Sequence, residues 1–436
     1  MPAKTIHDPL HGSIRVEGPF LDILDRHEVQ RLRNIKQLGL GNLVFPGANH
    51  TRFEHSLGVY HLAGRMAEAI GLSKEDSDTV MAAGLLHDIC HTPFSHTTEE
   101  IVEHNTGMDH MEMAEKLIKG KIRTYNERDE DMFGHVGPIS EVLENAGISS
   151  DKVCDLIINP EPKGDGVLAF DRNNPSFFSK GDYAHQIIHG PVDADQMDYL
   201  MRDAHYTGVT HGAIDIERLL NTMKVHNDRI MIEKSGTVAA EGLMVSRSLM
   251  YSSVYFHSTV RIIKMMLLKS IEASSLDIGE IYLWNDSDLM SYLISNGGTA
   301  SRIARSVSNR DIYKKTMIKY SEDTSDDLSA LLSGYSNYSN RKKLEQDIAD
   351  KAGVDLSDVI VDIPPPSVLQ SKMKIGKTDV SILDPEGKVR SLSKLSPVAK
   401  ALQSRDPFGW TLLVASPRSC SEAVGKAVGK VLDLSL

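Results

Sequence analysis

Three histidines and an aspartate lie within ten residues of one another, directly after an apolar segment. The segment Val80–Leu86 is made of helix-forming apolar residues, which predicts a buried helix. His87 and Asp88 follow it at once, and His91 and His96 come shortly afterwards. Burying imidazole and carboxylate together costs free energy unless another charge compensates them. Because these two groups are common ligands of divalent cations, the stretch predicts a metal site.

The spacing of the histidines indicates which of them lie on a helix and which in a loop. We expect a helix over residues 76–91, on which His87 and His91, four residues apart, share one face. Pro93 would end this helix, and His96 would then approach the same centre from a loop.

Two further metal ligands are expected from neighbouring helices. His55 lies in the preceding predicted helix, and antiparallel packing of the two helices would bring it to His87. Asp195 lies near the start of a third helix with Asp193 as its N-cap, where the helix dipole tolerates a carboxylate. Two histidines and two aspartates, counting Asp88, would leave coordination positions for water and substrate oxygens. A structural zinc site is disfavoured because the sequence has no Cys-x-x-Cys pair.

Other histidines and arginines could act on a phosphate group near this centre. His91, His96 and His110 are each either a general acid or a histidine packed in the core. Arg52 and Arg247 are the arginines that we expect to hold a polyphosphate, because a guanidinium binds phosphate with two parallel hydrogen bonds. Two more arginines are expected to form ion pairs with nearby acids at the surface: Arg202 and Arg218.

The composition is that of a globular protein without a membrane segment. The chain has 436 residues, of which 41% are hydrophobic and 25% charged. Its net charge of −12 and the lack of a Lys/Arg block make nucleic-acid binding unexpected. No apolar run approaches the roughly 18 residues of a membrane span, and the N-terminus lacks the apolar core of a signal peptide. Three scattered cysteines give no disulfide framework, so we expect a cytoplasmic protein.

All 18 histidines lie between His7 and His257, so histidine chemistry belongs to the first part of the chain. We expect a mainly α fold, with a helical core, a short N-terminal β-hairpin over 4–17 and a small C-terminal α+β unit. The predicted core helices are 19–38 with a break near Arg26, 52–70, 76–91, 97–119, 136–158, one beginning at Asp193, 213–225 and 238–273. Residues 159–182 are a predicted loop, and 276–356 are predicted to be polar and helical. The final unit is predicted to contain a hairpin over 380–390, a strand from Trp410 and a helix over 419–433. The expected domains are 1–273, 274–358 and 359–436.

The pattern His55…His87-Asp88…Asp195 resembles the H…HD…D arrangement of the HD-domain metal-dependent phosphohydrolases. Longer stretches are similar to the deoxynucleoside triphosphate triphosphohydrolase branch of that family, which includes dGTPase-like enzymes and the vertebrate protein that combines SAM and HD domains. These stretches are Asp8-Pro-Leu-His-Gly12, Gln30-Arg-Leu-Arg-Asn-Ile-Lys-Gln-Leu-Gly39, Phe45-Pro-Gly-Ala-Asn-His-Thr-Arg-Phe-Glu-His-Ser-Leu-Gly58, His87-Asp-Ile-Cys-His-Thr-Pro-Phe-Ser-His96 and Asp193-Ala-Asp-Gln-Met-Asp-Tyr-Leu-Met-Arg-Asp203. The similarity covers about residues 4–260 and says little about 276–436.

The resemblance implies hydrolysis of a deoxynucleoside triphosphate to deoxynucleoside and inorganic triphosphate, with a divalent metal ion (Mn, Mg, Fe, Ni or Zn). It implies four metal ligands: His55, His87, Asp88 and Asp195. It implies three histidines at the α-phosphate, one of them an acid towards the leaving group: His91, His96 and His110. The implied substrate contacts are Arg52 and Arg247 with the outer phosphates, Gln37, Leu38 and Asp203 with the sugar, Tyr199 against a ribose 2′-hydroxyl, and Tyr255. A GTP or dGTP effector site between subunits of a homodimer or homotetramer would use Lys4, Asp25, Gln30 and Arg33.

Two departures from the family pattern bear on the substrate. Gln196 stands where relatives often place a lysine against phosphate, and Phe256 replaces a polar residue. Two other functions therefore remain open: a different HD phosphohydrolase, such as a nucleotidase or phosphodiesterase, and a nucleotide sensor without turnover. For residues 274–436 the alternatives are packing on the core to build a subunit interface, which we favour, and effector binding.

Overall fold

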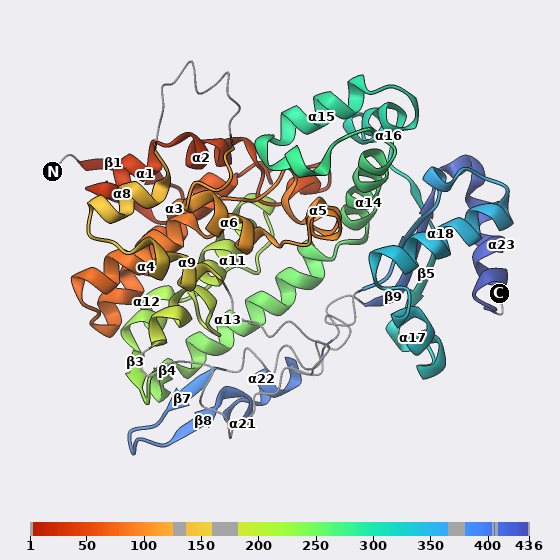
Figure 1. The fold of residues 1–436 in the computed structure, drawn as a ribbon. Helices are drawn as coiled ribbons and strands as arrows, with labels where there is room; N and C mark the ends of the chain where they lie inside the picture. The colour runs from red at the N-terminus through yellow and green to blue at the C-terminus, as the bar shows by residue number, and fades with distance from the viewer. Residues whose placement is uncertain are drawn as a thin grey trace.

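Helices make up most of the protein, and small sheets lie at its edges (Figure 1). The computed structural model describes residues 3–124, 137–158, 182–364, 380–402, 405 and 409–434. The expected mainly α fold with an N-terminal hairpin is confirmed. The predicted loop over 159–182 lies almost entirely outside the described residues. Among the described helices, none combines the length and the apolar character that a membrane crossing requires.

The chain begins with the expected hairpin of two antiparallel strands, β1 (Ala3–Asp8) and β2 (Gly12–Glu17). A carboxylate oxygen of Asp8 accepts hydrogen bonds from the backbone N–H groups of Leu10 and His11, at 2.9 and 3.0 Å, and so closes the turn. The predicted broken helix over 19–38 consists of three short segments: α1 (Pro19–Leu24), α2 (His27–Gln30) and a 3₁₀ turn (Arg31–Asn34).

Three helices form the centre of the molecule: α3 (Arg52–Ile70), α4 (Lys74–Leu86) and α11 (Ala194–Thr207). A capping box between Thr51 and Glu54 begins α3, and Ser73 caps α4. The predicted N-cap at Asp193 is confirmed, since its side chain accepts a hydrogen bond from the Gln196 N–H. The helix predicted over 76–91 is too long, because α4 ends at Leu86 and a tight turn follows.

Two other predicted helices are interrupted by glycine. The helix predicted over 97–119 is α5 (Glu99–Thr106) and α6 (His110–Ile118), separated by Gly107 with a φ of +69°. The helix predicted over 136–158 is α8 (Ile139–Asn145) and α9 (Ser150–Ile157), separated by Gly147 with a φ of +76°. Each glycine adopts the left-handed conformation that ends a helix.

The prediction of helix over 213–225 is wrong in its second half. Helix α12 (Ile216–Asn221) is followed by strand β3 (Met223–His226), which pairs with β4 (Arg229–Glu233). The long helix predicted over 238–273 is also divided. It consists of α13 (Thr237–Met250), a π-helical turn (Tyr251–Tyr255) and α14 (Ser258–Glu272). Single π-turns within a helix are often found at functional sites.

The C-terminal half contributes to two sheets. Its helices are α15 (Asp286–Ser295), α16 (Gly298–Ser308), α17 (Asp326–Ser333), α18 (Tyr338–Ala352), α21 (Leu392–Leu395), α22 (Pro397–Leu402) and α23 (Ser421–Val431). Strand β9 (Trp410–Ser416) lies between β5 (Lys314–Tyr320) and β6 (Ile360–Asp362), and all seven of its residues are buried. The predicted hairpin is β7 (Ser381–Leu383) with β8 (Val389–Ser391), and β7 extends the sheet of β3 and β4.

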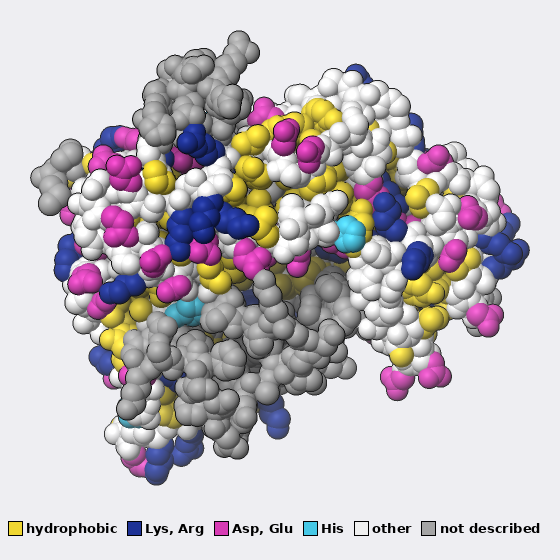
Figure 2. Space-filling view, viewed as in Figure 1, with side chains coloured by type: hydrophobic (Ala, Val, Ile, Leu, Met, Phe, Trp, Pro, Cys, Tyr) yellow, Lys and Arg dark blue, Asp and Glu magenta, His cyan; other side chains and the backbone are white. Residues whose placement is uncertain are grey.

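Strand β5 was missed because its lysines resemble those of the polar helices around it, and the structure corrects that part of 276–356. The domain boundaries 1–273, 274–358 and 359–436 stay a prediction, and strands from the last range belong to both sheets. Figure 2 shows acidic and basic side chains interspersed over the viewed face.

A buried ion pair ties the C-terminal half to the core. Lys269 on α14 and Glu345 on α18 are in contact, and their side chains are 4% and 1% exposed. Glu345 also accepts a hydrogen bond from the Val361 N–H at 3.0 Å. Removing one partner would leave the other charge buried without compensation.

We expect Lys269→Ala to lower the free energy of unfolding by about 3–5 kcal/mol, as found for broken buried pairs. The matched control is Lys426→Ala, which breaks an exposed pair with Glu422. That change is expected to cost at most about 0.5 kcal/mol. Chemical denaturation measures both values, and equal losses for the two variants would contradict this account of α14 and α18.

Candidate metal centre

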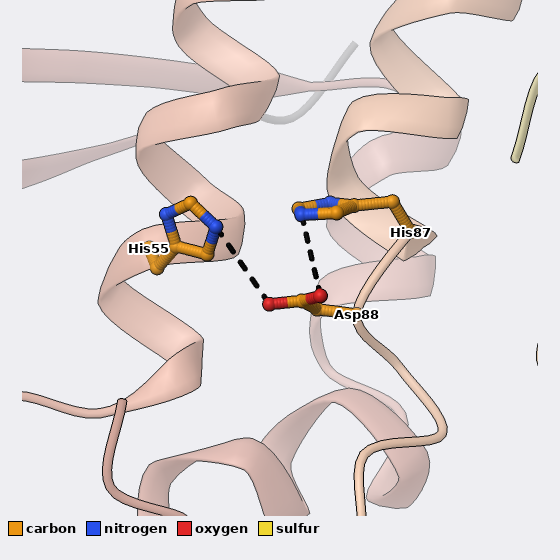
Figure 3. A group of neighbouring side chains, drawn as sticks. All are labelled: His55, His87 and Asp88. Atoms are coloured by element: carbon orange, nitrogen blue, oxygen red, sulfur yellow. Dashed lines mark ion pairs between the residues drawn. The ribbon is translucent and has the colours of Figure 1, made fainter. Parts of the chain in front are cut away.

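The three central helices bring His55, His87, Asp88 and Asp195 together (Figure 3 shows the first three). Asp195 Oδ1 lies 3.0 Å from His55 Nε2 and 3.7 Å from His87 Nε2. Asp88 lies between the two imidazoles, with Oδ2 3.7 Å from His55 Nε2 and Oδ1 3.4 Å from His87 Nε2. The ends of the helices explain this convergence. His55 lies in the first turn of α3, His87 and Asp88 directly follow α4, and Asp195 lies in the first turn of α11.

The donor set fits a divalent cation. The Nδ1–H of His55 donates to Asp198 Oδ2 at 2.8 Å, and that of His87 donates to the Gly84 carbonyl at 2.8 Å. Both imidazoles are therefore held through their outer nitrogen, with Nε2 towards the centre, as in protein metal sites. The Nε2 atom of His87 is buried and has no hydrogen-bond partner among the described residues. A buried nitrogen without a partner is costly, and a metal ion would satisfy it.

The Asp88 carboxylate is buried among cations. Arg52 Nη1 lies 2.5 Å from its Oδ2, and His91 Nε2 lies 2.9 Å from its Oδ1. Burial alone would raise the pKa of Asp88, but Arg52, His87 and His91 hold it well below its usual range. The group is therefore an anion at neutral pH and a competent metal ligand.

Asp198 supports the metal centre from behind. Its carboxylate accepts hydrogen bonds from His55, from His11 Nε2 at 2.7 Å and from Arg202 through two nitrogens at 2.8 and 2.9 Å. Arg202 also pairs with Asp8 at 2.8 Å and is fully buried. The expected acidic partners of Arg202 are present, but its expected surface position is wrong. Arg218 is exposed as expected, but it donates to the Ser235 carbonyl rather than to an acid.

His91 and His110 lie beside this centre, and their pKa values are shifted in opposite directions. His91 stacks on His110 with ring centroids 4.5 Å apart, and His110 Nδ1 lies 2.5 Å from Glu99 Oε1. Burial and the nearby Arg52 lower the pKa of His91 to about 3. Burial lowers the pKa of His110 too, but Glu99 outweighs it and the net shift is upward. The expectation that His87 and His91 share a helical face is wrong, since α4 ends before both.

His96 lies in a 3₁₀ turn over Ser95–Thr97, and its side chain is outside what the structure describes. Arg52 donates from Nε to the Ser95 hydroxyl at 3.0 Å, so this turn abuts the Arg52–Asp88 pair.

A second group of predicted residues lies around α11 and the π-turn. Arg247 Nη1 donates to Gln196 Oε1 at 2.9 Å, so it adjoins the helix that carries Asp195. The Tyr255 hydroxyl donates to Asp203 at 2.7 Å, and the Tyr199 ring meets Tyr255 edge-on at 6.0 Å. His50 also contacts Asp203, at 2.7 Å, and its carbonyl accepts the Gln37 N–H at 3.0 Å. Gln37 is buried, its Oε1 has no hydrogen-bond partner among the described residues, and Leu38 beside it is half-buried.

The four residues proposed for an effector form two exposed or half-exposed pairs near the hairpin. Lys4 Nζ lies 2.5 Å from Asp25, and both side chains are more than half exposed. Arg33 donates from Nε to Gln30 at 2.8 Å. None of these four residues is also one of the predicted metal ligands or substrate contacts.

Sequence reasoning missed four side chains next to the centre. They are His11, Glu99, Asp198 and Tyr251. Asp198 could have been found, because it lies three residues after Asp195 on the same helix. Glu99 carries no local signal, since it meets His110 only through the fold. His11 lies in the quoted stretch Asp8–Gly12, but its contact with Asp198 is likewise made only through the fold.

Comparisons with known protein families match two consecutive parts of the chain. The model of the HD domain matches residues 52–203, and the model of the HD associated region matches residues 214–436. The first range contains all four converging side chains. The chain belongs to the HD-domain family. This HD-domain protein is 34% identical over 424 residues to an uncharacterized protein of Methanocaldococcus jannaschii, covering 95% of this chain and 79% of that one.

Named relatives include deoxynucleoside triphosphate triphosphohydrolases. Human SAMHD1 is 30% identical over 335 residues, which is 72% of this HD-domain chain and 49% of SAMHD1. The SAMHD1 homolog of Dictyostelium discoideum is 30% identical over 277 residues, with 61% and 48% covered. The match thus spans about half the length of these two relatives. The predicted resemblance is confirmed at the level of the family.

Two solved structures share the fold. A hypothetical protein from Aquifex aeolicus superposes with a TM-score of 0.65 and 28% identity, covering 98% of this chain and 100% of that one. A phosphohydrolase from Bacteroides thetaiotaomicron gives a TM-score of 0.67 at 24% identity, covering 95% and 100%, which is a likeness of fold alone.

Asp198 reaches His55 only because Gly58 has no side chain. A Cβ at Gly58 would lie 1.9 Å from Asp198 Oδ1 and 2.7 Å from Arg202 Nη2. We expect Gly58→Ala to displace Asp198 and to weaken metal binding about 10- to 100-fold, as for lost supporting contacts of metal ligands. Gly64→Ala on the same helix is the control, because its Cβ would meet only the flexible Met81 side chain. Titration calorimetry with Mn²⁺ measures the two affinities, and equal values would contradict the role of Asp198.

Metal binding should release protons. Burial lowers the pKa of His55, but the carboxylates of Asp195 and Asp198 raise it to about 10 in the metal-free protein. His55 is therefore protonated at neutral pH and must lose a proton to become a ligand. We expect the affinity for Mn²⁺ to rise between pH 6 and pH 9, with about one proton or more released per ion. Calorimetry in buffers of different ionisation enthalpy counts these protons. A pH-independent affinity without proton release would show that the ion binds elsewhere.

Proposed function

We propose that this protein is a metal-dependent triphosphohydrolase that converts deoxynucleoside triphosphates to deoxynucleosides and inorganic triphosphate. The observation that carries the proposal is the convergence of His55, His87, Asp88 and Asp195, with Asp195 Oδ1 within 3.0 and 3.7 Å of the two histidines. The kinship with enzymes named deoxynucleoside triphosphate triphosphohydrolases supports the choice of substrate.

These four side chains would hold one divalent cation, Mn, Mg, Fe, Ni or Zn. When bound, such an ion polarises phosphoryl oxygens and lowers the pKa of coordinated water. The protein's own part is to keep the ligands oriented: Asp198 fixes the His55 ring, and the Gly84 carbonyl fixes the His87 ring.

Arg52 and Arg247 would bind the phosphates from two sides. Arg52 is held in place by Asp88 and Ser95, so its guanidinium is already oriented before a substrate arrives. Arg247 adjoins Gln196, the residue that stands where relatives often have a lysine. We propose that Arg247 supplies the positive charge that Gln196 does not.

Of the three histidines proposed at the α-phosphate, His110 is the best suited as acid. Burial lowers the pKa of His110, but the contact with Glu99 outweighs it and raises the pKa, which favours the protonated ring that could give a proton to the leaving deoxynucleoside. His91 is neutral at the same pH, because its pKa is lowered to about 3, and it would act as a hydrogen-bonding partner. His96 would join them from the adjoining turn.

Specificity for the deoxyribose would come from the aromatic side chains near Asp203. Tyr199 would occupy the space of a 2′-hydroxyl, while Gln37, Leu38 and Asp203 contact the sugar and Tyr255 orients Asp203. A site without a partner for the extra hydroxyl rejects it by contact and by lost hydrogen bonding.

Regulation and location are further parts of the proposal. GTP or dGTP would bind near Lys4, Asp25, Gln30 and Arg33, at an interface in a homodimer or homotetramer to which residues 274–436 contribute. A cytoplasmic location agrees with the three cysteines Cys90, Cys154 and Cys420, all of which are free.

The test is the identity of the product. The protein, incubated with Mn²⁺ or Mg²⁺ and each deoxynucleoside or ribonucleoside triphosphate, with and without GTP, should release inorganic triphosphate from deoxynucleotides preferentially. His87→Ala and Asp88→Ala should lower turnover by at least about 10³-fold, since each removes a metal ligand. His104→Ala is the control, because His104 is exposed and contacts Tyr338 instead.

The other outcomes are equally definite. Monophosphate or orthophosphate as product would identify a nucleotidase or phosphodiesterase instead. Nucleotide binding without any product would identify a sensor. Full turnover by His87→Ala would overturn the assignment of the metal centre.

A further inference from the structure

The turn that carries His91 and His96 has a strained backbone. Phe94 and Ser95 have φ angles of +56° and +48°, in the left-handed region that residues other than glycine rarely adopt. Such a conformation persists only where surrounding contacts hold it. The turn is nevertheless tightly packed, because Phe94 and Ser95 are 5% and 1% exposed.

This turn is tied at two points to one short segment far along the chain. The Phe94 N–H donates to Asp286 Oδ1 at 2.7 Å. Arg31 Nη2 donates to the His91 carbonyl at 3.0 Å and to the Trp284 carbonyl at 2.7 Å. Residues 284–286, at the start of α15, thus hold the turn at its first residue and in its strained middle.

The same carboxylate reaches a second loop. Asp286 Oδ2 accepts the Lys36 N–H at 3.0 Å. Lys36 directly precedes Gln37 and Leu38, which the proposed function places against the sugar. One buried carboxylate, 7% exposed, therefore joins the loop of the proposed acid and the loop of the proposed sugar contacts.

Asp286 is not needed to cap its own helix. Asn285 is the N-cap of α15, and its side chain accepts hydrogen bonds from the Ser287 and Asp288 N–H groups, while the Asp288 carboxylate accepts one from the Asn285 N–H. A carboxylate that is buried without serving its own helix must be compensated by the groups that it contacts. Among the described residues, the side chain of Asp286 accepts its hydrogen bonds from the backbone of these two loops.

We propose that Asp286 is a positioning residue, which holds the His91–His96 turn and the 36–38 loop in the single arrangement that the reaction requires. It acts from the HD associated region on a turn of the HD domain and on a loop that precedes this domain, so the associated region is part of the catalytic apparatus although it supplies none of the four proposed metal ligands. The expected change in kcat and KM rests on the proposed function. The expected change in the hydrogen exchange of the two loops rests on the structure alone.

The experiment compares Asp286→Ala with Asp288→Ala, the neighbouring acid of the same helical turn that is exposed and touches neither loop. In Asp286→Ala we expect kcat to fall about 10- to 100-fold and KM to rise, because small displacements of catalytic groups have effects of this size. Mn²⁺ affinity should be unchanged, since Asp286 touches none of the four ligands. Asp288→Ala should keep the wild-type kcat and KM.

Hydrogen exchange tests the same inference without turnover. The amides of Phe94 and Lys36 should be protected in the wild type and in Asp288→Ala, and should lose protection in Asp286→Ala. If Asp286→Ala does not fold, Asp286→Asn replaces it. Its amide keeps one acceptor oxygen and turns an NH₂ group towards the other loop, so one of the two amides should lose protection.

The outcomes separate this inference from the proposed function. A wild-type protein that hydrolyses no nucleotide refutes the proposed function, while amide protection still decides the role of Asp286. Wild-type kinetics and protection in Asp286→Ala would overturn the inference. Loss of Mn²⁺ binding together with turnover would also overturn it, because the role would then be general stability.

Discussion

Burial of charge at the meeting point of α3, α4 and α11 constrains the rest of the structure. Asp88 and the imidazoles of His55 and His87 are buried within a few ångströms of one another, which is costly unless each has partners. Arg52 compensates Asp88, and Asp198 with Arg202 fixes His55. The Nε2 atom of His87 has no hydrogen-bond partner among the described residues, and a cation would satisfy it. The arrangement is therefore best understood as one prepared for a metal ion.

The charged groups are brought together at the ends of helices. Residues at the end of α4 and in the first turns of α3 and α11 point towards a common centre, while the bodies of the helices form the core. Of the residues that would act on the substrate, several lie on helices, while His91, His96, Gln37 and Leu38 lie in turns or loops. Asp286 of the C-terminal half contacts two of these loops. Asp286 and the buried Lys269–Glu345 pair show that this half is joined to the core by buried polar contacts.

Local patterns predicted the centre well. The helix at 52–70, the cap at Asp193 and the two hairpins were readable from periodicity, capping and turn residues. The residue types made His55 and Asp195 candidates beside His87 and Asp88, and the family resemblance implied the set of four. Strand β5 was missed because its three lysines resemble those of the polar helices around it. The helix predicted over 76–91 ends at Leu86, and the helix predicted over 97–119 is interrupted at Gly107, which adopts a left-handed conformation. The roles of His11, Glu99 and Asp286 were not predicted, because no local pattern indicates the distant residue that each one contacts. Such pairings exist only after the chain has folded.

The most direct test of the metal centre is anomalous diffraction from crystals grown with Mn²⁺. The account predicts one strong peak within about 2.0–2.5 Å of His55 Nε2, His87 Nε2, Asp88 and Asp195, the range of metal–ligand bonds in proteins. A peak that leaves out His55 or Asp195, or an ion bound at another cluster, would contradict the account.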